Sequence, residues 1–96
     1  MKKATNINGT SLQGYITITL DELTSKLGAP DMYMGDKVTA EWAFQDGDAV
    51  FTIYDYKEDV TPIGTYDWHI GGLDSSVLLS VRKLFPNHKV RGYRDA

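Results

Sequence analysis

A tight turn between two alternating runs constrains the fold of this chain more than any other feature. Residues 38–44 alternate apolar and polar side chains, which is the period of a half-buried strand. Asp46-Gly47 follows, and Asp-Gly between such runs is the strongest short-range signal for a β-hairpin. Residues 49–56 carry bulk on both faces, which favours a central strand. The sequence therefore predicts a hairpin over residues 38–56.

Periodicity and capping predict the elements on either side of this hairpin. Thr19 followed by Glu22 forms a capping box that opens a short helix, and Gly28 with Pro30 ends it. A stripe of apolar residues at helical spacing predicts a second helix before Pro86. The expected elements are a strand at 15–18, a helix at 20–27, the hairpin, a strand at 66–70, a helix at 75–85 and, as a fifth strand, a short charged edge at 89–93.

The chain length and the order of these elements indicate the fold class. The 96 residues suit one domain, and the absence of cysteine excludes disulfides and thiolate metal sites. We expect an α+β protein: a single two-layer domain with an antiparallel sheet of about four to five strands and two helices on one face. Polar residues 1–14 predict a flexible N-terminal segment, which leaves residues 15–93 as the domain.

Charge and hydropathy narrow the classes of partner. The basic start at Met1 is not followed by an apolar run, and no stretch reaches the length of a membrane helix, so we expect no membrane association and a cytoplasmic location. The sequence from Asp31 to Asp74 contains ten acidic residues and two lysines, whereas the part of the chain from Ser75 onward is basic. Nucleic-acid binding is not expected of the acidic part. The two patches leave open a homo-oligomer or a basic partner.

The segment from Asp67 to Gly72 is the strongest candidate for chemistry. Asp67 and His69 share a strand face, so the carboxylate could orient the imidazole. Gly71-Gly72 precede a helix, where free backbone N–H groups could hold an anion, and Trp68 could stack on a base. Trp68, His69, Gly71 and Gly72 thus form a candidate nucleotide site, completed by a basic residue such as Arg91 or Arg94. The favoured alternative is a core tryptophan, a structural histidine and a glycine turn.

Signatures of catalysis are missing from the sequence. There is no Gly-x-Ser-x-Gly elbow, no His-Glu-x-x-His helix and no phosphate-binding loop. We therefore predict no catalytic residue, no cofactor and no metal site, with a phosphodiesterase built on Asp67 and His69 as the enzymatic alternative. The outward side of the hairpin is instead a candidate protein-contact surface. Its residues are Glu41, Tyr54, Asp55, Tyr56 and Glu58.

Five short segments form a set that carries a resemblance. They are Leu27-Gly28-Ala29-Pro30, Gly35-Asp36-Lys37-Val38, Glu41-Trp42, Thr52-Ile53-Tyr54-Asp55-Tyr56-Lys57 and Asp67-Trp68-His69-Ile70-Gly71-Gly72. The set resembles a family of small proteins encoded by tailed bacteriophages and prophages, over roughly residues 15–85. That family has no settled activity, so the resemblance implies viral origin and expression in the cytoplasm of a bacterial host, but no catalytic residue.

Three functions follow as expectations from this resemblance and from the small size of the chain. The first is an accessory phage protein that binds and inhibits a host protein, in particular one of antiviral defence, as anti-CRISPR proteins do. The second is an oligomeric binder that sequesters a small signalling nucleotide. The third is a minor structural component of the phage particle.

Overall fold

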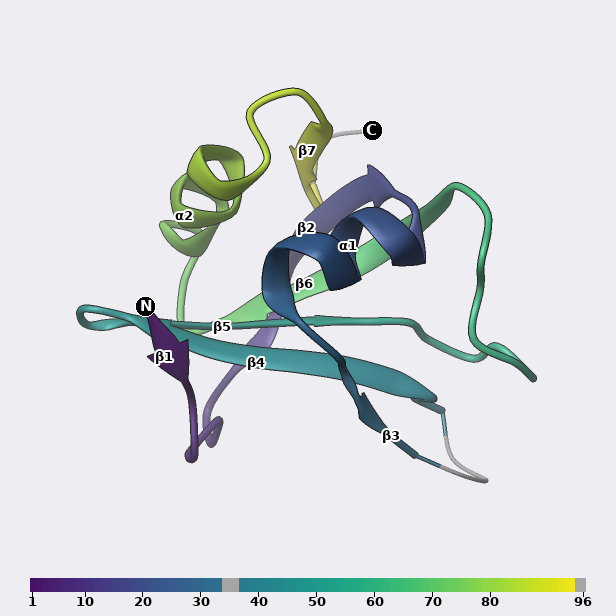
Figure 1. Cartoon of the computed structure of the whole chain (residues 1–96). Coiled ribbons are helices and arrows are strands. Elements are labelled where there is room, and N and C mark those ends of the chain that lie inside the picture. Colours follow the sequence, from purple (N-terminus) through teal and green to yellow (C-terminus); the bar gives the residue numbers. More distant parts are fainter. Residues whose placement is uncertain (34–36, 95–96) are drawn as a thin grey trace.

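The computed structural model describes residues 1–33 and 37–94, and within them a sheet of seven strands carries two helices (Figure 1). Gly35 and Asp36, which belong to one of the motifs above, lie outside the described residues. The elements are β1 (Lys2–Lys3), β2 (Ser11–Ile18), α1 (Leu20–Leu27), β3 (Asp31–Met32), β4 (Ala40–Asp46), β5 (Ala49–Tyr54), β6 (Tyr66–Gly72), α2 (Val77–Leu84) and β7 (Lys89–Gly92).

All strand pairs of the sheet are antiparallel, in the order β1-β4-β5-β6-β2-β7, and β3 also pairs with β4. The predicted hairpin is present as β4 and β5, with Asp46 opposite Ala49. Gly47, the first of the two loop residues, has φ 61°. A positive φ at this position is typical of the tight turns that match strand twist, and it favours glycine.

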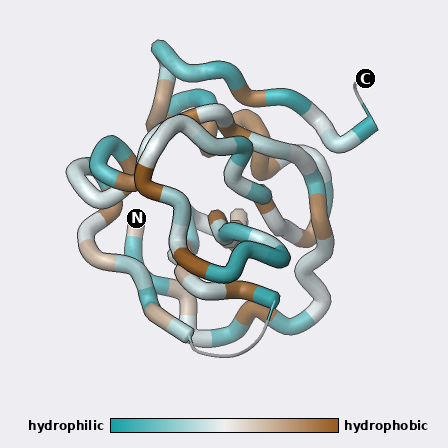
Figure 2. Tube along the Cα trace, turned by 90° about the vertical axis from the view of Figure 1, so that its right-hand side faces the viewer, coloured by the Kyte–Doolittle hydropathy of each residue, from teal (hydrophilic) through white to brown (hydrophobic). Residues whose placement is uncertain are grey.

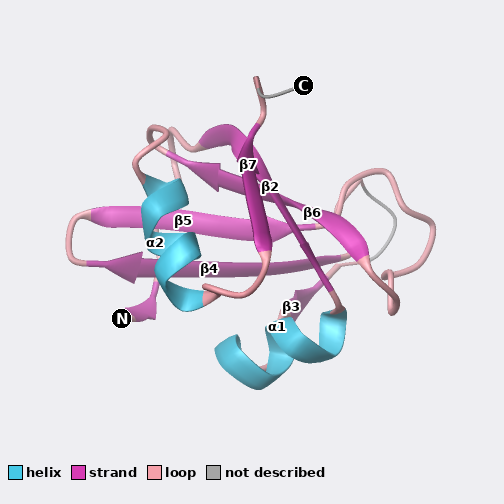
Figure 3. Ribbon diagram, turned by 90° about the horizontal axis from the view of Figure 1, so that it is seen from above, coloured by secondary structure: helices cyan, strands magenta, loops and turns pink. Residues whose placement is uncertain are grey.

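The predicted fold class is confirmed: the protein is α+β, with an antiparallel sheet and both helices on the same face (Figures 1 and 3). The sheet has more strands than the four to five expected. β1 and β3 contain two residues each, which is too short for a periodic pattern to reveal them. Both pair with β4 on the side away from β5, where backbone hydrogen bonds, rather than apolar side chains, hold them.

The N-terminal boundary also differs from the prediction. Polar composition predicts a flexible segment over residues 1–14, but the structure places Lys2–Lys3 and residues 11–14 in the sheet. The alternation that marks β2 begins only at Tyr15, because the register shifts at a bulge between Leu12 and Gly14. The sheet therefore begins earlier in the chain than the apolar pattern does.

The core lies between the helices and the sheet face beneath them. The Trp42 and Trp68 rings meet edge-on with centroids 5.4 Å apart, and Leu23 of α1 is fully buried. Trp42 Nε1 also donates to the Gly28 carbonyl at 2.8 Å, which ties β4 to the end of α1. Hydrophilic and hydrophobic segments follow one another closely along the chain (Figure 2). The buried apolar residues are Ile16, Ile18, Leu23, Ala40, Trp42, Phe51, Ile53, Trp68, Ile70, Val77, Leu78, Val81 and Phe85.

The capping box at the start of α1 forms as predicted. Glu22 N donates to Thr19 Oγ1 at 3.2 Å, and Thr19 N donates to Glu22 Oε1 at 3.4 Å. Glu22 also binds Nε2 of His88 at 2.6 Å, which joins α1 to the segment before β7. Neither of the described helices is long and apolar enough to cross a membrane.

Gly72 offers a test of how closely α2 approaches the sheet. A Cβ at Gly72 would lie 2.6 and 2.7 Å from the two γ carbons of Val77. We expect Gly72→Ala to lower the free energy of unfolding by about 1–3 kcal/mol, because the added methyl group would overpack the contact with Val77. Gly64 has no atom within 4 Å of such a Cβ, so Gly64→Ala is the matched control and should change stability by less than about 1 kcal/mol. Urea unfolding measures both, and equal midpoints would contradict the packing described.

Candidate functional site

A row of five side chains crosses the sheet on the face opposite α1 and α2. Glu41 lies opposite Tyr54, Tyr54 opposite His69, His69 opposite Tyr15, and Tyr15 opposite Arg91. Directly opposed residues have Cβ atoms about 5 Å apart, so the row is continuous across β4, β5, β6, β2 and β7. We call the surface formed by Glu41, Tyr54, Tyr56, His69, Tyr15 and Arg91 the tyrosine face.

Strand alternation explains why these side chains gather there. In β2, Ile16 points into the core, so its neighbour Tyr15 points to the other face. In β6, Trp68 is buried in the core and His69 next to it lies on the tyrosine face. The apolar side chains of each strand therefore pack against the helices. The aromatic and polar side chains on the other face of the sheet remain half-exposed.

His69 lies at the centre of three tyrosine rings. Its ring centroid is 5.0 Å from that of Tyr15, 5.3 Å from that of Tyr54 and 5.4 Å from that of Tyr56. Burial lowers the pKa of His69. The nearby carboxylates of Asp55, Asp67 and Glu58 act in the opposite direction but do not cancel the shift. Among the described residues, His69 Nδ1 has no hydrogen-bond partner. The imidazole therefore packs among aromatic rings, and its burial disfavours the protonated form.

Arg91 forms the basic end of the row. Its guanidinium carbon lies 4.6 Å from the Tyr15 ring centroid, within the range of a cation–π contact. Its Nη1 lies 3.5 Å from Asp67 Oδ1, which also accepts a 2.6 Å hydrogen bond from Thr17 Oγ1. The bond from Thr17, followed by the contact with Arg91, lowers the pKa of Asp67. Asp67 is thus engaged by Thr17 and Arg91.

Glu41 forms the acidic end. Its side chain is half-buried, and burial raises its pKa, although the 3.2 Å hydrogen bond from the Tyr33 hydroxyl acts in the opposite direction. Asp31 lies opposite Glu41 on β3 and pairs with Lys3 Nζ at 3.4 Å. The tyrosine face therefore runs from carboxylates over β3 and β4 to the guanidinium on β7.

The predicted protein-contact residues divide between this face and the interior. Glu41, Tyr54 and Tyr56 lie on the tyrosine face. Asp55 is fully buried and accepts hydrogen bonds from Thr39 N at 2.7 Å, from Ala40 N at 3.0 Å and from Thr39 Oγ1. Its carboxylate holds the backbone of Thr39 and Ala40 at the start of β4 and is not available to a protein partner.

Glu58, the fifth predicted contact residue, is half-buried in the segment that follows β5. It accepts a 3.2 Å hydrogen bond from the Tyr66 hydroxyl, which also receives a 3.2 Å bond from Tyr56 N. Lys57 Nζ lies 5.4 Å from the Tyr56 ring centroid. Lys57 is therefore at the rim of the tyrosine face, whereas Glu58 is bound to Tyr66, whose ring packs against the core residue Trp68.

The predicted ligand residues do not converge on one site. Trp68 and His69 lie on opposite faces of β6, and the Trp68 side chain is completely buried, so it cannot stack on a base. Gly71 and Gly72 are inside β6 and pair with β2 on one side and β5 on the other. Helix α2 begins only at Val77.

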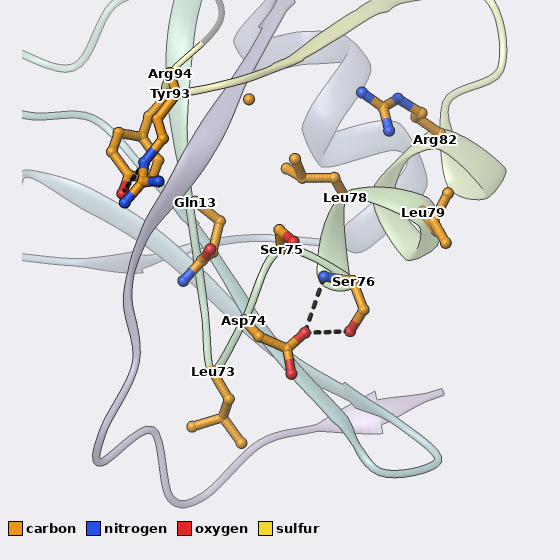
Figure 4. A pocket seen from close by; sticks show the side chains of 11 residues that line it. Gln13, Leu73, Asp74, Ser75, Ser76, Leu78, Leu79, Arg82, Tyr93 and Arg94 are labelled. Carbon is orange, nitrogen blue, oxygen red and sulfur yellow. Dashed lines mark hydrogen bonds between the residues drawn. The ribbon is translucent and has the colours of Figure 1, made fainter.

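A carboxylate already occupies the start of α2. Asp74 Oδ1 accepts a 2.9 Å hydrogen bond from Ser76 N (Figure 4). The negative charge of Asp74 at this end of the helix disfavours the bound anion that the glycine pair was expected to hold. The Ser76 N–H, which an anion site between β6 and α2 would need, is therefore already bound by Asp74.

An open hollow of about 770 Å³ lies between α2 and the end of β7 (Figure 4). Of the residues named as site candidates from the sequence, only Arg94 is among the described residues that line it. Arg82 donates from Nη2 to the Val90 carbonyl at 3.2 Å, so this cation is already engaged. Leu73, Leu79 and Tyr93 line the hollow and are exposed.

Sequence reasoning missed Tyr15, which belongs to the tyrosine face, and Thr17, which binds Asp67 next to it. The alternation of residues 15–18 shows that both side chains share a face, which is the only signal available. That this face is shared with His69 follows from the pairing of β2 with β6, which joins residues 54 positions apart in the case of Tyr15 and His69.

No group of three histidine or carboxylate side chains within residues 1–33 and 37–94 is arranged to hold a metal ion. Comparison with protein-family models, with curated proteins and with solved structures finds no match to this chain. The fold and the tyrosine face therefore carry the functional argument.

Asp55→Ala tests whether this carboxylate is structural. We expect it to lower the free energy of unfolding by about 2–4 kcal/mol, because three donors of Thr39 and Ala40 lose their acceptor. Asp59→Ala, at an exposed position four residues away, should change stability by less than about 0.5 kcal/mol. Chemical unfolding compares the two, and equal losses would show that burial of Asp55 contributes nothing particular.

The packing around His69 predicts a measurable titration. Its pKa lies below the ordinary 6.5 because burial disfavours the imidazolium. Tyr54→Ala removes one covering ring, so we expect the His69 pKa to rise toward 6.5 in an NMR titration. Tyr93→Ala, an exposed truncation outside the ring cluster, should leave it unchanged.

The same shift fixes the sign of a stability effect. Because the folded protein binds the proton less readily than the unfolded chain, the contribution of His69 is complete above about pH 6.5 and is lost as pH falls through the folded pKa. Relative to a His69→Asn variant, which retains the other titrating groups such as Glu41, the stability of the wild-type protein should fall between pH 7 and pH 5, and a relative rise would contradict the burial of His69 among the rings.

Proposed function

We propose that this chain is a non-catalytic binding protein that engages another protein through the tyrosine face. The observation that carries the proposal is the row of Tyr54, His69 and Tyr15, held between Glu41 and Arg91 on the sheet face opposite the helices. Tyrosine and arginine are enriched at the energetic centres of protein interfaces. Cross-strand packing holds these rings in place, so little ordering entropy is lost on binding.

Binding, rather than catalysis, suits the chemistry of the face. A general base needs a proton partner within hydrogen-bond reach, and the half-buried His69 ring instead packs among tyrosine rings, with no partner at Nδ1 among the described residues. Asp67, which could have oriented this imidazole, directs Oδ1 to Thr17 and Arg91. These contacts favour a recognition surface over an acid–base pair.

The resemblance to phage proteins suggests a narrower form of the proposal. The segments from Thr52 to Lys57 and from Asp67 to Gly72 carry that resemblance, and they supply Tyr54, Tyr56 and His69 to the face. In this form, the protein acts in the cytoplasm of a bacterial host, where it blocks a host factor of antiviral defence by covering its surface.

Affinity capture from a bacterial lysate tests this function. We expect the wild-type protein to retain a host protein, and Tyr54→Ala combined with Tyr56→Ala to weaken the complex about tenfold or more, as for interface hot spots. The control is Leu79→Ala, which shortens an exposed side chain of α2 on the opposite side of the sheet and should leave capture unchanged.

Far-ultraviolet circular dichroism and thermal unfolding must first show that both variants fold. Equal capture by the wild-type protein and by the folded tyrosine variant would overturn the assignment of the face. Capture that fails only in Leu79→Ala would move the binding surface to the helices.

A further inference from the structure

The tyrosine face has a symmetry that points to its partner. His69 on β6 is the middle of the row: Glu41 on β4 lies two strands away in one direction, and Arg91 on β7 two strands away in the other. At a strand spacing of about 4.8 Å, each charge is about 10 Å from the centre of the row. The two ends carry opposite charge at matched distances.

A two-fold axis can place such a face against itself in two simple ways. With the axis parallel to the row, Glu41 would meet Glu41 and Arg91 would meet Arg91, which like-charge repulsion disfavours. With the axis parallel to the strands above β6, the row is reversed, and each Glu41 meets Arg91 of the second copy. The charges of the face therefore select the second arrangement.

We propose that the tyrosine face docks onto the same face of a second copy of this chain, about a two-fold axis that runs along β6. The inference rests on the proposed function, because it names an occupant of the same face. In the dimer, Tyr54 lies over Tyr15 of the second copy, and the two His69 rings meet at the axis. Face-to-face sheets pack about 10 Å apart, a gap that side chains from both faces fill.

The charged ends can each accept the new partner. Glu41 is half-buried and receives a hydrogen bond from the Tyr33 hydroxyl, and a carboxylate has about four lone-pair sites, so capacity remains for a guanidinium. Arg91 has five N–H donors, of which the contact with Asp67 uses part. Burial of each Glu41–Arg91 pair on docking costs desolvation, which bidentate hydrogen bonding within the pair offsets.

Two charges that flank the row follow the same polarity. Lys89 lies two residues before Arg91 on β7, and Asp31 lies opposite Glu41 on β3. Reversal of the row places the β7 lysine of one copy toward the β3 carboxylate of the other. Lys3 and Asp67 oppose this pattern in part, since each binds the charge of opposite sign at its own end. Lys2 opposes it as well, because it lies opposite Gln45, on the same face of the sheet as Glu41.

A host factor that uses this face competes with the second copy. The host factor then binds only the free monomer. Its apparent affinity for the protein therefore falls as the total protein concentration rises. The dimer would protect the aromatic side chains until a tighter partner displaces the second copy.

Charge exchange tests the dimer directly. We expect light scattering on a size-exclusion column to give the mass of two chains for the wild-type protein at about 0.1 mM. Glu41→Arg and Arg91→Glu alone should each weaken association about tenfold or more, because each places like charges together. An equimolar mixture of the two variants should restore the dimer, because one variant is positive at both ends of the row and the other is negative at both.

The control is Lys83→Glu, a charge reversal on an exposed position of α2 that should leave the dimer intact. If either single reversal does not fold, Glu41→Gln and Arg91→Gln supply the milder test, with weakened association expected for each. A wild-type protein that remains monomeric at this concentration overturns the inference, as does a folded charge reversal that remains a dimer.

Failure of the dimer and failure of the proposed function give different results. A monomeric wild-type protein whose capture of a host protein still depends on Tyr54 and Tyr56 removes only the second copy as partner. A dimer that responds to the charge reversals, together with capture that ignores those tyrosines, removes only the host-binding role of the face.

Discussion

The pairing of β2 with β6 is the contact on which the rest of the structure depends. It is registered from Ser11 opposite Gly72 to Ile18 opposite Tyr66, and it joins the first long strand of the chain to the last central one. On the helix side it sets Ile16 beside Trp68 in the core, and on the other side it sets Tyr15 beside His69. Among the described strands, β7 pairs with the sheet only through β2. The core, the tyrosine face and the C-terminal edge therefore share one strand pair.

Local signals in the sequence were sufficient for the elements but not for their order. The hairpin of β4 and β5 was predictable because the turn residues and both alternating runs lie within 19 positions, residues 38–56. The capping box of α1 was predictable because its two partners, Thr19 and Glu22, are three positions apart. The place of β2 between β6 and β7 was not predictable, because an alternating run states which residues share a face and not which strand lies beside them.

The candidate site was predictable in the same partial way. Alternation in the hairpin and in residues 66–70 correctly separates Tyr54 and His69 from the core side chains, but the compact appearance of the Asp67–Gly72 motif is misleading. Trp68 and His69 are neighbours in the chain and lie on opposite faces of the sheet. Asp55 follows the last residue of β5, and nothing in its polar surroundings reveals that its carboxylate is buried on the backbone of Thr39 and Ala40.

The strand order also shapes how the chain reaches its native state. β2 is synthesised early, yet both of its neighbours come from residues 66–92, so the sheet cannot close until nearly the whole chain is available. Pairings between distant segments slow folding, because the entropy of loop closure is lost before the contacts form. Until then, Ile16 and Ile18 lie on an unpaired strand of a nascent chain, where transient exposure to other chains favours aggregation. The hairpin, by contrast, needs only its own turn, and it can offer a preformed edge on which the later strands assemble.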